Sequence, residues 1–517
     1  MQIQINKEKC TGCSYCMLSC PEEAIFLDIK ENTVPVIDKQ LCTQCGECVY
    51  LCPNNVFSSE GGKTHSTIKN EDYDIVIIGA GIGGLMTAAG LAKAGKTVLV
   101  IEQLSFIGGK YTHLTYKGYT TSTAAWTCPG PNSRIGSLSK RLGADIDWVT
   151  IHDVGSRGDH WVVKKDGRRF KTLDETQETL VGGSKGMAQV YKWIADMYHP
   201  RRNPPSDMTA RGYIESFFPE NEDYIKYVET IITHCFASQT VDNFSAYELK
   251  KAIVDSIEQM ADWGTAIGGT AAIVAGIQKV IMDNGGEIAL RTKVDNIIIE
   301  ENTAKGIVLS SGETIKANVV IHNAGLNRLI KLAGKSNLPD EYVKRLNSAI
   351  PATVAAIILG TNKSLLGKNH SLLHTMGFER TFNCYAPTFF DPNLAPNNKH
   401  ILDVFWVMEP PFDHQKELEI ADKILKEIFP EIDQVTDVKI PMFFSGMWTA
   451  ELAHRIGQSG DERLDPITPI RNLYMVGYDC IGYGIAGDII PHGVEKLLYT
   501  LLGDEIYKTV DLSLIHI

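Results

Sequence analysis

Hydrophobic residues in the chain occur in short apolar runs, which are typical of strands, and in longer apolar stretches, which are typical of helices. Residues 73–78, Tyr-Asp-Ile-Val-Ile-Ile, form a short and almost wholly apolar run, which predicts a buried strand. An Ala-rich apolar stretch then reaches about residue 94, and a second short apolar run occupies residues 97–101. The pattern predicts a strand, a helix and a second strand in succession, a βαβ unit.

Further short strands are predicted beyond this unit. Apolar positions alternate at residues 297–299 and 306–309 around a turn, and apolar runs follow at 319–322 and 400–407. The intervening regions, about 130–260 and 330–450, contain helical patterns rich in aromatic residues. Ordinary core packing is the favoured interpretation of each aromatic, and the lining of a lipophilic tunnel is the alternative; the residues concerned are Trp193, Phe217, Phe218, Tyr227 and Phe236.

Length and composition narrow the class of protein. A chain of 517 residues is long enough for several domains, and 44% apolar with 22% charged residues is typical of globular proteins. A net charge of -12 argues against a nucleic-acid binder. The longest apolar run, residues 350–360, is shorter than the ~20 residues of a membrane-spanning helix, and no secretory leader is visible. We therefore expect a cytoplasmic protein.

Eight of the twelve cysteines lie between Cys10 and Cys52. They form two runs of the pattern C-x2-C-x2-C-x3-C-P, and the second run begins 32 residues after the first. Thiolates at this spacing can surround an iron–sulfur cubane, with Gly12 and Gly46 easing the tight turns. A disulfide scaffold and a zinc ribbon are the alternatives, and two complete runs without a secretory leader disfavour both.

Residues 1–57 resemble bacterial-type ferredoxins that carry two 4Fe-4S clusters. In such ferredoxins the fourth cysteine of each run binds the other cluster. The resemblance thus implies one cluster on Cys10, Cys13, Cys16 and Cys52, and a second on Cys20, Cys42, Cys45 and Cys48. Residues 58–72 are interpreted as a linker.

The turn after the strand at 73–78 reads Gly79-Ala-Gly81-Ile-Gly83-Gly84. In a βαβ unit this pattern binds a dinucleotide: Gly79 permits the tight turn, Gly81 lets the backbone approach the pyrophosphate, and Gly84 lets helix and strand pack closely. Glu102, at the end of the second strand, is expected to hold the adenosine ribose, and an acidic residue there disfavours a 2′-phosphate.

Five later segments, at 108–110, 268–294, 297–325, 391–407 and 472–487, resemble the amine oxidase and phytoene desaturase superfamily of flavoproteins, and the resemblance extends over about residues 73–503. Gly108-Gly109-Lys110 is similar to a segment that carries arginine in most relatives, and a lysine keeps its positive charge. The resemblance implies that Val294 lies against the adenine and that the strand ending at Asn323 reaches the cofactor. Residues 472–477 and 482–487 are similar to the second flavin-contacting element, which places Gly477, Asp479 and Gly484 at the cofactor.

Residues 482–487 also match the dinucleotide pattern by themselves. Too little chain follows for another strand with a ribose-binding residue, so a second nucleotide site is not expected. We expect the flavin to exchange electrons through the fused clusters instead.

The predicted fold is a multidomain α/β and α+β protein, with a small ferredoxin-like module and a Rossmann-like FAD-binding domain interleaved with a substrate domain. The expected FAD-binding segments are 73–130, 260–330 and 455–503, and the substrate segments are 131–259 and 331–454. The tail, 504–517, resembles translated adapter sequence over its last seven residues and supports no inference.

The resemblance implies an FAD-dependent oxidoreductase that reduces, desaturates or isomerises carbon–carbon bonds of an isoprenoid- or carotenoid-like lipid. Reduction is favoured because bacterial-type clusters are usually low-potential donors. Alternatives are an amine or amino-acid dehydrogenase that passes electrons outward, and an electron-transfer subunit of a larger complex. Expected partners are a small lipophilic substrate and a soluble, ferredoxin-like electron donor or acceptor, with peripheral membrane contact compatible with a lipid substrate.

Catalytic acid–base residues are not located by the sequence. Isolated cysteines and histidines are more often buried structural residues than catalytic ones, so none is assigned; these are Cys128, His234, Cys235, Cys384 and Cys480.

Overall fold

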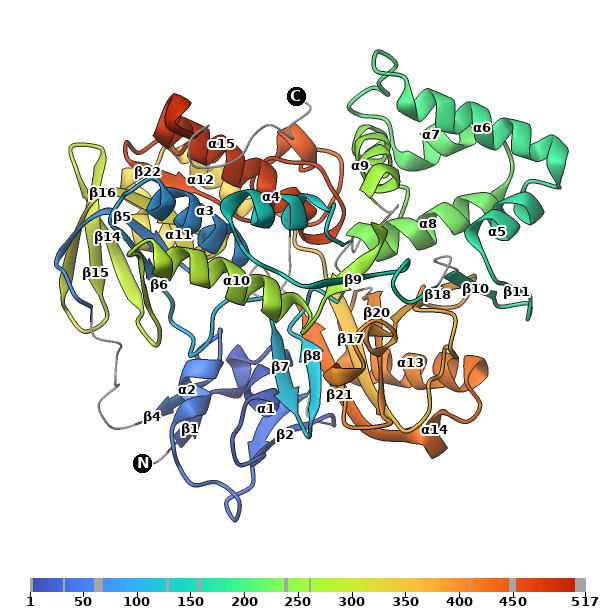
Figure 1. The fold of residues 1–517 in the computed structure, drawn as a ribbon, viewed down its shortest axis with the longest axis horizontal. Helices are drawn as coiled ribbons and strands as arrows, with labels where there is room; N and C mark the ends of the chain where they lie inside the picture. Colours follow the sequence, from blue (N-terminus) through green and yellow to red (C-terminus); the bar gives the residue numbers. More distant parts are fainter. Residues whose placement is uncertain are drawn as a thin grey trace.

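The computed structural model describes residues 3–30, 33–59, 68–126, 130–155, 160–236, 240–259, 262–408, 410–445 and 452–506. Cys128, the centre of the expected linker (60–67) and the tail from residue 507 onward lie outside these residues. The described chain forms a small N-terminal region and two larger parts, each built on a seven-stranded sheet (Figure 1). The predicted mixed, multidomain fold class is confirmed.

The N-terminal region is a pseudo-repeat of short strands and helices. β1 (Ile3–Ile5) pairs antiparallel with β4 (Phe57–Ser59), and β2 (Ile25–Asp28) pairs antiparallel with β3 (Val34–Ile37). The short helices α1 (Tyr15–Leu18) and α2 (Glu47–Leu51) each follow a residue in the left-handed backbone conformation, Ser14 at φ 64° and Gly46 at φ 80°. Both helices therefore begin directly after a tight turn that contains cysteines.

The first large sheet contains the predicted βαβ unit. β5 (Asp72–Ile78), α3 (Ile82–Lys93) and β6 (Val98–Ile101) follow one another, and β5 and β6 are parallel neighbours. The strand order is β13-β6-β5-β16-β15-β14, and β22 pairs with β16. The added strands are β13 (Glu287–Ala289), β14 (Val294–Glu300), β15 (Thr303–Leu309), β16 (Thr314–His322) and β22 (Leu473–Met475).

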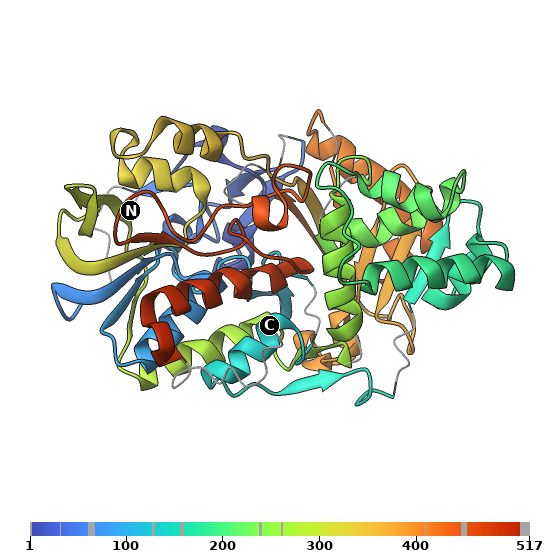
Figure 2. The same cartoon turned by 90° about the horizontal axis from the view of Figure 1, so that it is seen from above.

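Helices cover both faces of this sheet, and this explains why its parallel neighbours β5 and β6 are mostly apolar on both sides. One face packs against α3, α4 (Arg134–Leu142), α10 (Thr270–Asp283) and α15 (Ile490–Leu502). The other face packs against α11 (Leu326–Ala333) and α12 (Asp340–Asn347). Figure 2 shows α4, α10 and α15 side by side, with α11 and α12 on the opposite side of the sheet.

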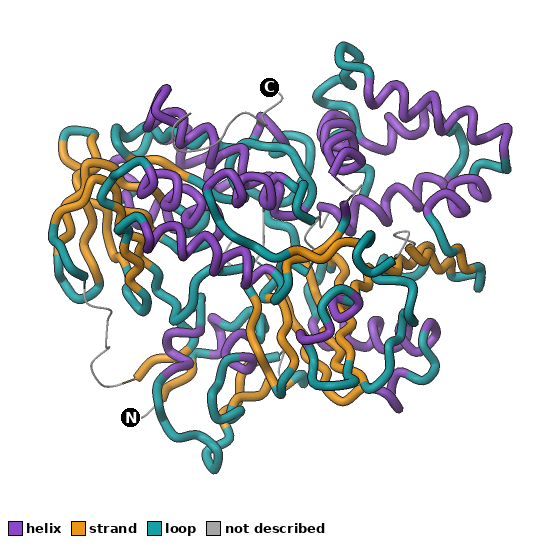
Figure 3. The backbone as a smooth tube through the Cα atoms, viewed as in Figure 1, coloured by secondary structure: helices purple, strands orange, loops and turns teal. Residues whose placement is uncertain are grey.

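The second large sheet has the order β11-β10-β18-β19-β20-β17-β21. Its long central strands β17 (Val354–Thr361), β20 (His400–Val407) and β21 (Thr436–Phe444) pair antiparallel. The remaining strands are β10 (His160–Lys164), β11 (Arg169–Phe170), β18 (Leu372–Met376) and β19 (Asn383–Tyr385), and α13 (His414–Ile428) packs on one face of the sheet. A helical layer adjoins the β11 and β10 edge of the sheet (Figure 3) and consists of α5 (Leu173–Leu180), α6 (Ser184–Tyr198), α7 (Ala210–Phe217), α8 (Glu222–Phe236) and α9 (Ala246–Gln259). Within it, α8 also contacts β18, β19 and β20.

The N-terminal region packs against the face of the second sheet opposite α13. Met17 and Ile25 share one apolar cluster with Ile440 and Met442 of β21. The backbone amide of Phe443 donates to the carbonyl of Gly12 over 3.1 Å. Two further short hairpin strands, β7 (His113–Tyr116) and β8 (Tyr119–Ser122), adjoin this contact, as Figure 1 shows. The cysteine loops are thus held against the body of the protein.

Among the described residues, no helix combines the length and the apolar character needed to cross a membrane.

Candidate active site and cofactor sites

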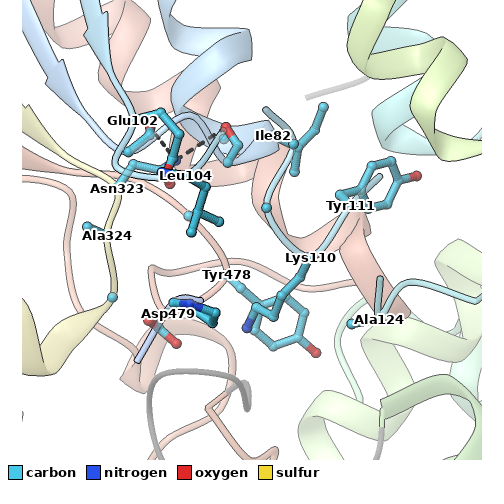
Figure 4. Close-up of a pocket in the computed structure, with 18 of the residues that line it drawn as sticks. Ile82, Glu102, Leu104, Lys110, Tyr111, Ala124, Asn323, Ala324, Tyr478 and Asp479 are labelled. Carbon is cyan, nitrogen blue, oxygen red and sulfur yellow. Dashed lines mark hydrogen bonds between the residues drawn. The ribbon is translucent and has the colours of Figure 1, made fainter. Parts of the chain in front are cut away.

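A cavity of about 490 Å³ lies between the first sheet, the second sheet and the N-terminal region. Figure 4 shows side chains converging on it from several of these elements. Ten of the residues predicted for cofactor binding line the cavity; they are Gly79, Gly81, Gly83, Glu102, Gly109, Lys110, Val294, Asn323, Gly477 and Asp479. The fold therefore gathers into one site residues that are up to 400 positions apart in sequence (479 − 79).

The glycine turn between β5 and α3 is closed by Asn323. The Asn323 side-chain amide donates to the carbonyls of Gly79 and Gly81, over 3.1 and 3.2 Å. A Cβ atom at Gly81 would lie only 2.9 Å from Asn323 Nδ2, so an alanine there would displace this amide. The first backbone N–H groups of a helix have no partner within the helix, and those of α3 begin at this wall of the cavity. The turn thus suits the pyrophosphate of a dinucleotide.

Two predicted glycines do not line the cavity. Gly84 lies inside α3, where a Cβ would lie 2.6 Å from the carbonyl oxygen of Gly79. Gly484 adopts φ 141° in the loop before α15, and a Cβ there would lie 2.9 Å from the backbone of Asp488. In the structure both glycines allow close backbone packing beside the cavity.

Glu102 is fixed at the end of β6 by backbone amides. Its carboxylate accepts from Ala80 N over 2.8 Å and from Leu104 N over 2.9 Å, and Figure 4 shows Glu102 next to Leu104. Burial raises the pKa of Glu102, although these two amides and the guanidinium of Arg328 act in the opposite direction. Burial also lowers the pKa of Arg328, which follows the start of α11, to about 10. Carboxylate oxygens held in this way retain lone pairs for the hydroxyl groups of a ribose.

The opposite part of the cavity is formed by the chain after β22 and by the start of the last helix. Gly477, Tyr478 and Asp479 line it, together with Gly487 and Ile490. In Figure 4 the ring of Tyr478 lies well apart from Glu102, near Lys110. The positions of the two groups fit an extended dinucleotide, with the ribose near Glu102 and the ring system near Tyr478.

Beyond Tyr478 the lining becomes aromatic. Trp126 stacks on Phe405 of β20 with ring centroids 5.0 Å apart, and it meets Phe444 edge-on at 5.7 Å. His234, at the end of α8, lies 5.5 Å from the Phe405 ring and 5.0 Å from that of His374. This part of the cavity offers flat apolar surfaces to a substrate.

The first cysteine set encloses a second, much smaller cavity. Cys10, Cys13, Cys16 and Cys52 all line it. Burial raises the pKa of Cys13 to about 12, and the neighbouring Cys52 adds to the effect. Burial also raises the pKa of Cys16, with Cys13 and Cys52 as further causes. Buried thiolates this close together repel one another unless a cation lies between them, so the four sulfurs suit an iron cluster.

The second set is gathered around Cys48. Burial raises the pKa of Cys48 to about 12, and the further causes are its neighbours Cys45, Cys20 and Cys42. Cys45 is exposed and Cys42 is half-buried, whereas Cys13, Cys16 and Cys52 of the first set are buried. The two sets share a motif but differ in their access to solvent.

Several lining residues were not predicted from the sequence. His234 and Cys235 were left unassigned, and Trp126 and Phe405 carried no signal, because each lies in a segment without a recognisable motif. Of the five aromatics weighed as tunnel residues only Phe236 lines the cavity, while Trp193, Phe218 and Tyr227 are buried in the core of the helical layer and Phe217 packs against it. Ordinary core packing holds for these four.

Two family profiles match the chain. The profile "flavin containing amine oxidoreductase" matches residues 82–488, and "4Fe-4S dicluster domain" matches residues 9–56. The first match covers well over half of the chain and includes Glu102 in one part of the large cavity and Tyr478 in the other. The second covers all eight clustered cysteines. The predictions of FAD and of two 4Fe-4S clusters are confirmed.

Curated relatives match the flavoprotein part at low identity. Chloroplastic prolycopene isomerase of Daucus carota is 23% identical over 430 residues, which cover 72% of this chain and 69% of the relative. The neurosporene-forming phytoene desaturase of Cereibacter sphaeroides is 26% identical over 395 residues, 67% of this chain and 74% of the relative.

Solved structures share the fold. An oxidoreductase from Methanosarcina mazei has a TM-score of 0.72 at 26% identity and covers 82% of this chain and 99% of its own. A putrescine oxidase has a TM-score of 0.63 at 16% identity, covering 84% of this chain and 99% of its own, and shares the fold alone. The chain therefore belongs to the flavin containing amine oxidoreductase family, as an FAD-dependent oxidoreductase fused to a two-cluster 4Fe-4S domain.

Proposed function

We propose that this oxidoreductase reduces carbon–carbon double bonds of an isoprenoid- or carotenoid-like lipid, with electrons that pass from its 4Fe-4S clusters to FAD. One observation carries the electron route. Tyr15 and Pro53 line both the large cavity and the small cavity of the first cysteine set. Two cofactors separated by one layer of side chains are suitably placed to exchange electrons.

Each of the two cysteine sets is assigned as the ligands of one cluster. Cys10, Cys13, Cys16 and Cys52 bind the cluster beside FAD, and Cys20, Cys42, Cys45 and Cys48 bind the outer one. Because Cys45 is exposed, a cluster held by this set would be open to a small soluble electron donor such as a ferredoxin. The first set, beside the large cavity, would hold the cluster that supplies single electrons to FAD. FAD, when bound, supplies the conversion of single electrons into two-electron chemistry.

FAD is held by the cavity residues described above. The turn at Gly79, Gly81 and Gly83 would hold the pyrophosphate, and Glu102 would hold the ribose. Val294 would lie against the adenine, and Asn323 keeps the turn closed. Near the flavin the lining residues are Gly109, Lys110, Gly477 and Asp479. Gly84 and Gly484 support this site through close packing and not through contact.

An isoprenoid substrate is supported by the aromatic part of the lining. Trp126, Phe236 and Phe405 present apolar ring surfaces, which favour a hydrocarbon chain over an ammonium group. The relatives named prolycopene isomerase and phytoene desaturase agree with this substrate class. We propose that the protein contacts a membrane surface peripherally to reach a lipid of this kind.

The proposal also includes the division of the chain into domains and the cellular location of the protein. Segments 73–130, 260–330 and 455–503 bind FAD, and segments 131–259 and 331–454 shape the substrate site. We propose a cytoplasmic location, because cluster cysteines have to remain reduced until iron and sulfide bind.

The test is a stoichiometric reduction without oxygen. The protein is reconstituted with iron, sulfide and FAD, reduced, and mixed with polyprenyl or carotenoid lipids while the flavin and cluster absorbance is followed. Reoxidation with a saturated product supports the proposal. If no lipid reoxidises the protein while an amine bleaches the oxidised flavin, electrons run outward and the proposal is wrong.

A further inference from the structure

Three buried side chains from distant parts of the sequence form a hydrogen-bonded chain that ends at the large cavity. His454 Nδ1 lies 2.6 Å from Glu248 Oε1, and His454 Nε2 lies 2.6 Å from the hydroxyl of Tyr478. The side chains of Glu248 and His454 are fully buried. Tyr478 lines the cavity between Gly477 and Asp479. The chain of bonds therefore runs from α9 to the flavin-contacting loop.

The surroundings make this arrangement rigid. Phe236 and Phe244 flank the imidazole of His454, with ring centroids 5.1 and 6.0 Å away. Arg463 donates to the carbonyl of Tyr478 over 2.7 Å, and its guanidinium lies 5.2 Å from the Tyr478 ring centroid. Imidazole and phenol are thus held in one geometry.

The order of the groups defines the direction of the hydrogen bonds. An ionised carboxylate can only accept, so Nδ1 of His454 carries a hydrogen when Glu248 is ionised. Glu248 lies in the first turn of α9, where the helix dipole favours a negative charge. Nε2 is then left to exchange a proton with the phenol. A carboxylate that orients an imidazole, which in turn exchanges a proton with a hydroxyl, is the arrangement of hydrolase triads.

Reduction of a double bond requires two electrons and two protons. The electron pair and one hydrogen come from reduced FAD, and the second hydrogen has to arrive as a proton. We propose that Tyr478 Oη gives this proton to the substrate carbon and that the imidazolium form of His454 replaces it from Nε2, with Glu248 holding the ring; the neutral imidazole then regains a proton from solvent before the next turnover. Tyr478 is then the catalytic residue, and His454 and Glu248 are positioning residues. This inference rests on the proposed function.

Other titratable and charged groups lie near the hydrogen-bonded chain of Glu248, His454 and Tyr478, here called the relay. A pH effect on the relay has to be separated from the titration of these other groups. In the described residues they include Asp479 beside Tyr478, Lys110 of the same cavity, Arg463 after the 3-10 helix at 460–462, and His234 and Cys235 of α8. Burial raises the pKa of Cys235 to about 12, so this thiol stays protonated at neutral pH. Asp479 and His234 remain unchanged in every variant proposed below.

The experiment uses the full-length protein loaded with FAD and clusters, without oxygen. The variants are Tyr478→Phe, Glu248→Gln and His454→Gln. The matched control is Tyr483→Phe, which removes a phenol hydroxyl bonded to Asp461 over 2.8 Å, outside the cavity lining. FAD content and thermal unfolding are recorded for each protein, and Tyr478→Phe keeps the ring, so it is the variant on which the conclusion depends.

The first readout needs no substrate. The visible absorption of oxidised FAD is titrated with pH, because a charge that appears beside the flavin shifts its bands. We expect one ionisation in the wild type and in Tyr483→Phe that is absent from Tyr478→Phe. A titration that is missing in the wild type, or that persists unchanged in Tyr478→Phe, overturns the relay.

The second readout is the reduction of a polyprenyl alcohol by the prereduced protein. Loss of a general acid typically slows a reaction about 100-fold or more, and we expect this for Tyr478→Phe with its FAD content unchanged. The wild-type rate should fall as pH rises, because imidazolium is consumed. In Glu248→Gln this fall should move to lower pH, because the carboxylate that favours imidazolium is gone.

The two readouts fail in different ways. If the wild type reduces no polyprenyl alcohol, the proposed function fails and the absorption titration alone decides about the relay. If the lipid is reduced and Tyr478→Phe retains both the wild-type rate and the wild-type titration, the proposed function stands and the relay is wrong.

Discussion

The two cysteine sets of the N-terminal region share one motif and differ in surroundings. Cys10, Cys13, Cys16 and Cys52 enclose a cavity whose wall, Tyr15 and Pro53, is also a wall of the flavin cavity. In the other set Cys45 is exposed and Cys42 is half-buried. A duplicated sequence has thus acquired an inner and an outer side, because the first cysteine set lies deeper against the rest of the protein than the second. Burial, and not the motif, decides what each half does.

The sharpest way to break this comparison is a pair of matched substitutions, Cys13→Ser and Cys45→Ser. Each should lose about half of the bound iron, since each removes a ligand of one of two equal clusters. Reduction of FAD by a small bacterial ferredoxin should stop almost completely in Cys13→Ser, and it should slow but continue in Cys45→Ser. Iron analysis and stopped-flow absorbance at the flavin band measure both effects. Equal rates in the two variants would contradict the inner and outer assignment.

The shared wall provides a second test. Tyr15 is 3% exposed, and its hydroxyl donates to the carbonyl of Thr123 over 3.0 Å. Tyr15→Ala should lower the free energy of unfolding by about 3–5 kcal/mol, as loss of a large buried aromatic does. Tyr15→Phe should cost only about 1 kcal/mol, because a single hydrogen bond is lost. Denaturant unfolding measures the difference, and Phe26→Ala at an exposed position of the same region is the control.

Each of the two large sheets contains a buried histidine, and both histidines should make the stability of the protein depend on pH. Burial lowers the pKa of His322, at the end of β16, and of His374, in β18, to about 4 each. In the unfolded chain both have a pKa near 6.5, so folding excludes a proton from each. Stability from these groups is complete above about pH 6.5 and is lost as pH falls towards 4, by at most about 3 kcal/mol per histidine. Thermal unfolding from pH 7 to 4 checks this, and a flat profile would contradict it.

The smallest expected effect concerns an ion pair between the N-terminal region and the rest of the protein. Glu47 of α2 and Arg291 form an ion pair of 2.6 Å at a partly exposed site. Glu47→Gln should change the free energy of unfolding by less than about 1 kcal/mol, and the change should shrink at high salt. Denaturant unfolding at two salt concentrations measures it. A cost that is several times larger would show that the outer half depends on the body as strongly as the inner half does.

Local motifs predicted their own geometry well. Gly12 and Gly46 adopt positive φ at the cysteine turns, and the turn at Gly79 and Gly81 joins β5 to α3 as the spacing predicts. The strand at 400–407 coincides with β20. These features were predictable because a few consecutive residues fix the backbone: thiolate spacing, positive φ and the period of the apolar positions all act within one turn or strand.

The substrate end of the site was less predictable. His234 and Phe405 lie in segments with ordinary helix and strand patterns, and only the pairing of β20 with β19 and the end of α8 brings them together. The local sequence around a histidine in a helix does not indicate which aromatic ring its side chain will contact in the folded protein. Sequence patterns therefore located this region only by elimination.

The sequence by itself indicated iron–sulfur clusters and a dinucleotide and where their turns lie, because the two cysteine runs and the glycines of the dinucleotide turn are patterns of spacing along the chain. Resemblance to known families added FAD and the division of the cysteines between the clusters. The tertiary structure alone decided which cysteine set faces the flavin and which side chains meet Tyr478. Glu248, His454 and Tyr478 come from three segments, and their hydrogen bonds exist only after packing has excluded water. Contacts of that kind depend on the relative placement of whole elements, which no local pattern contains.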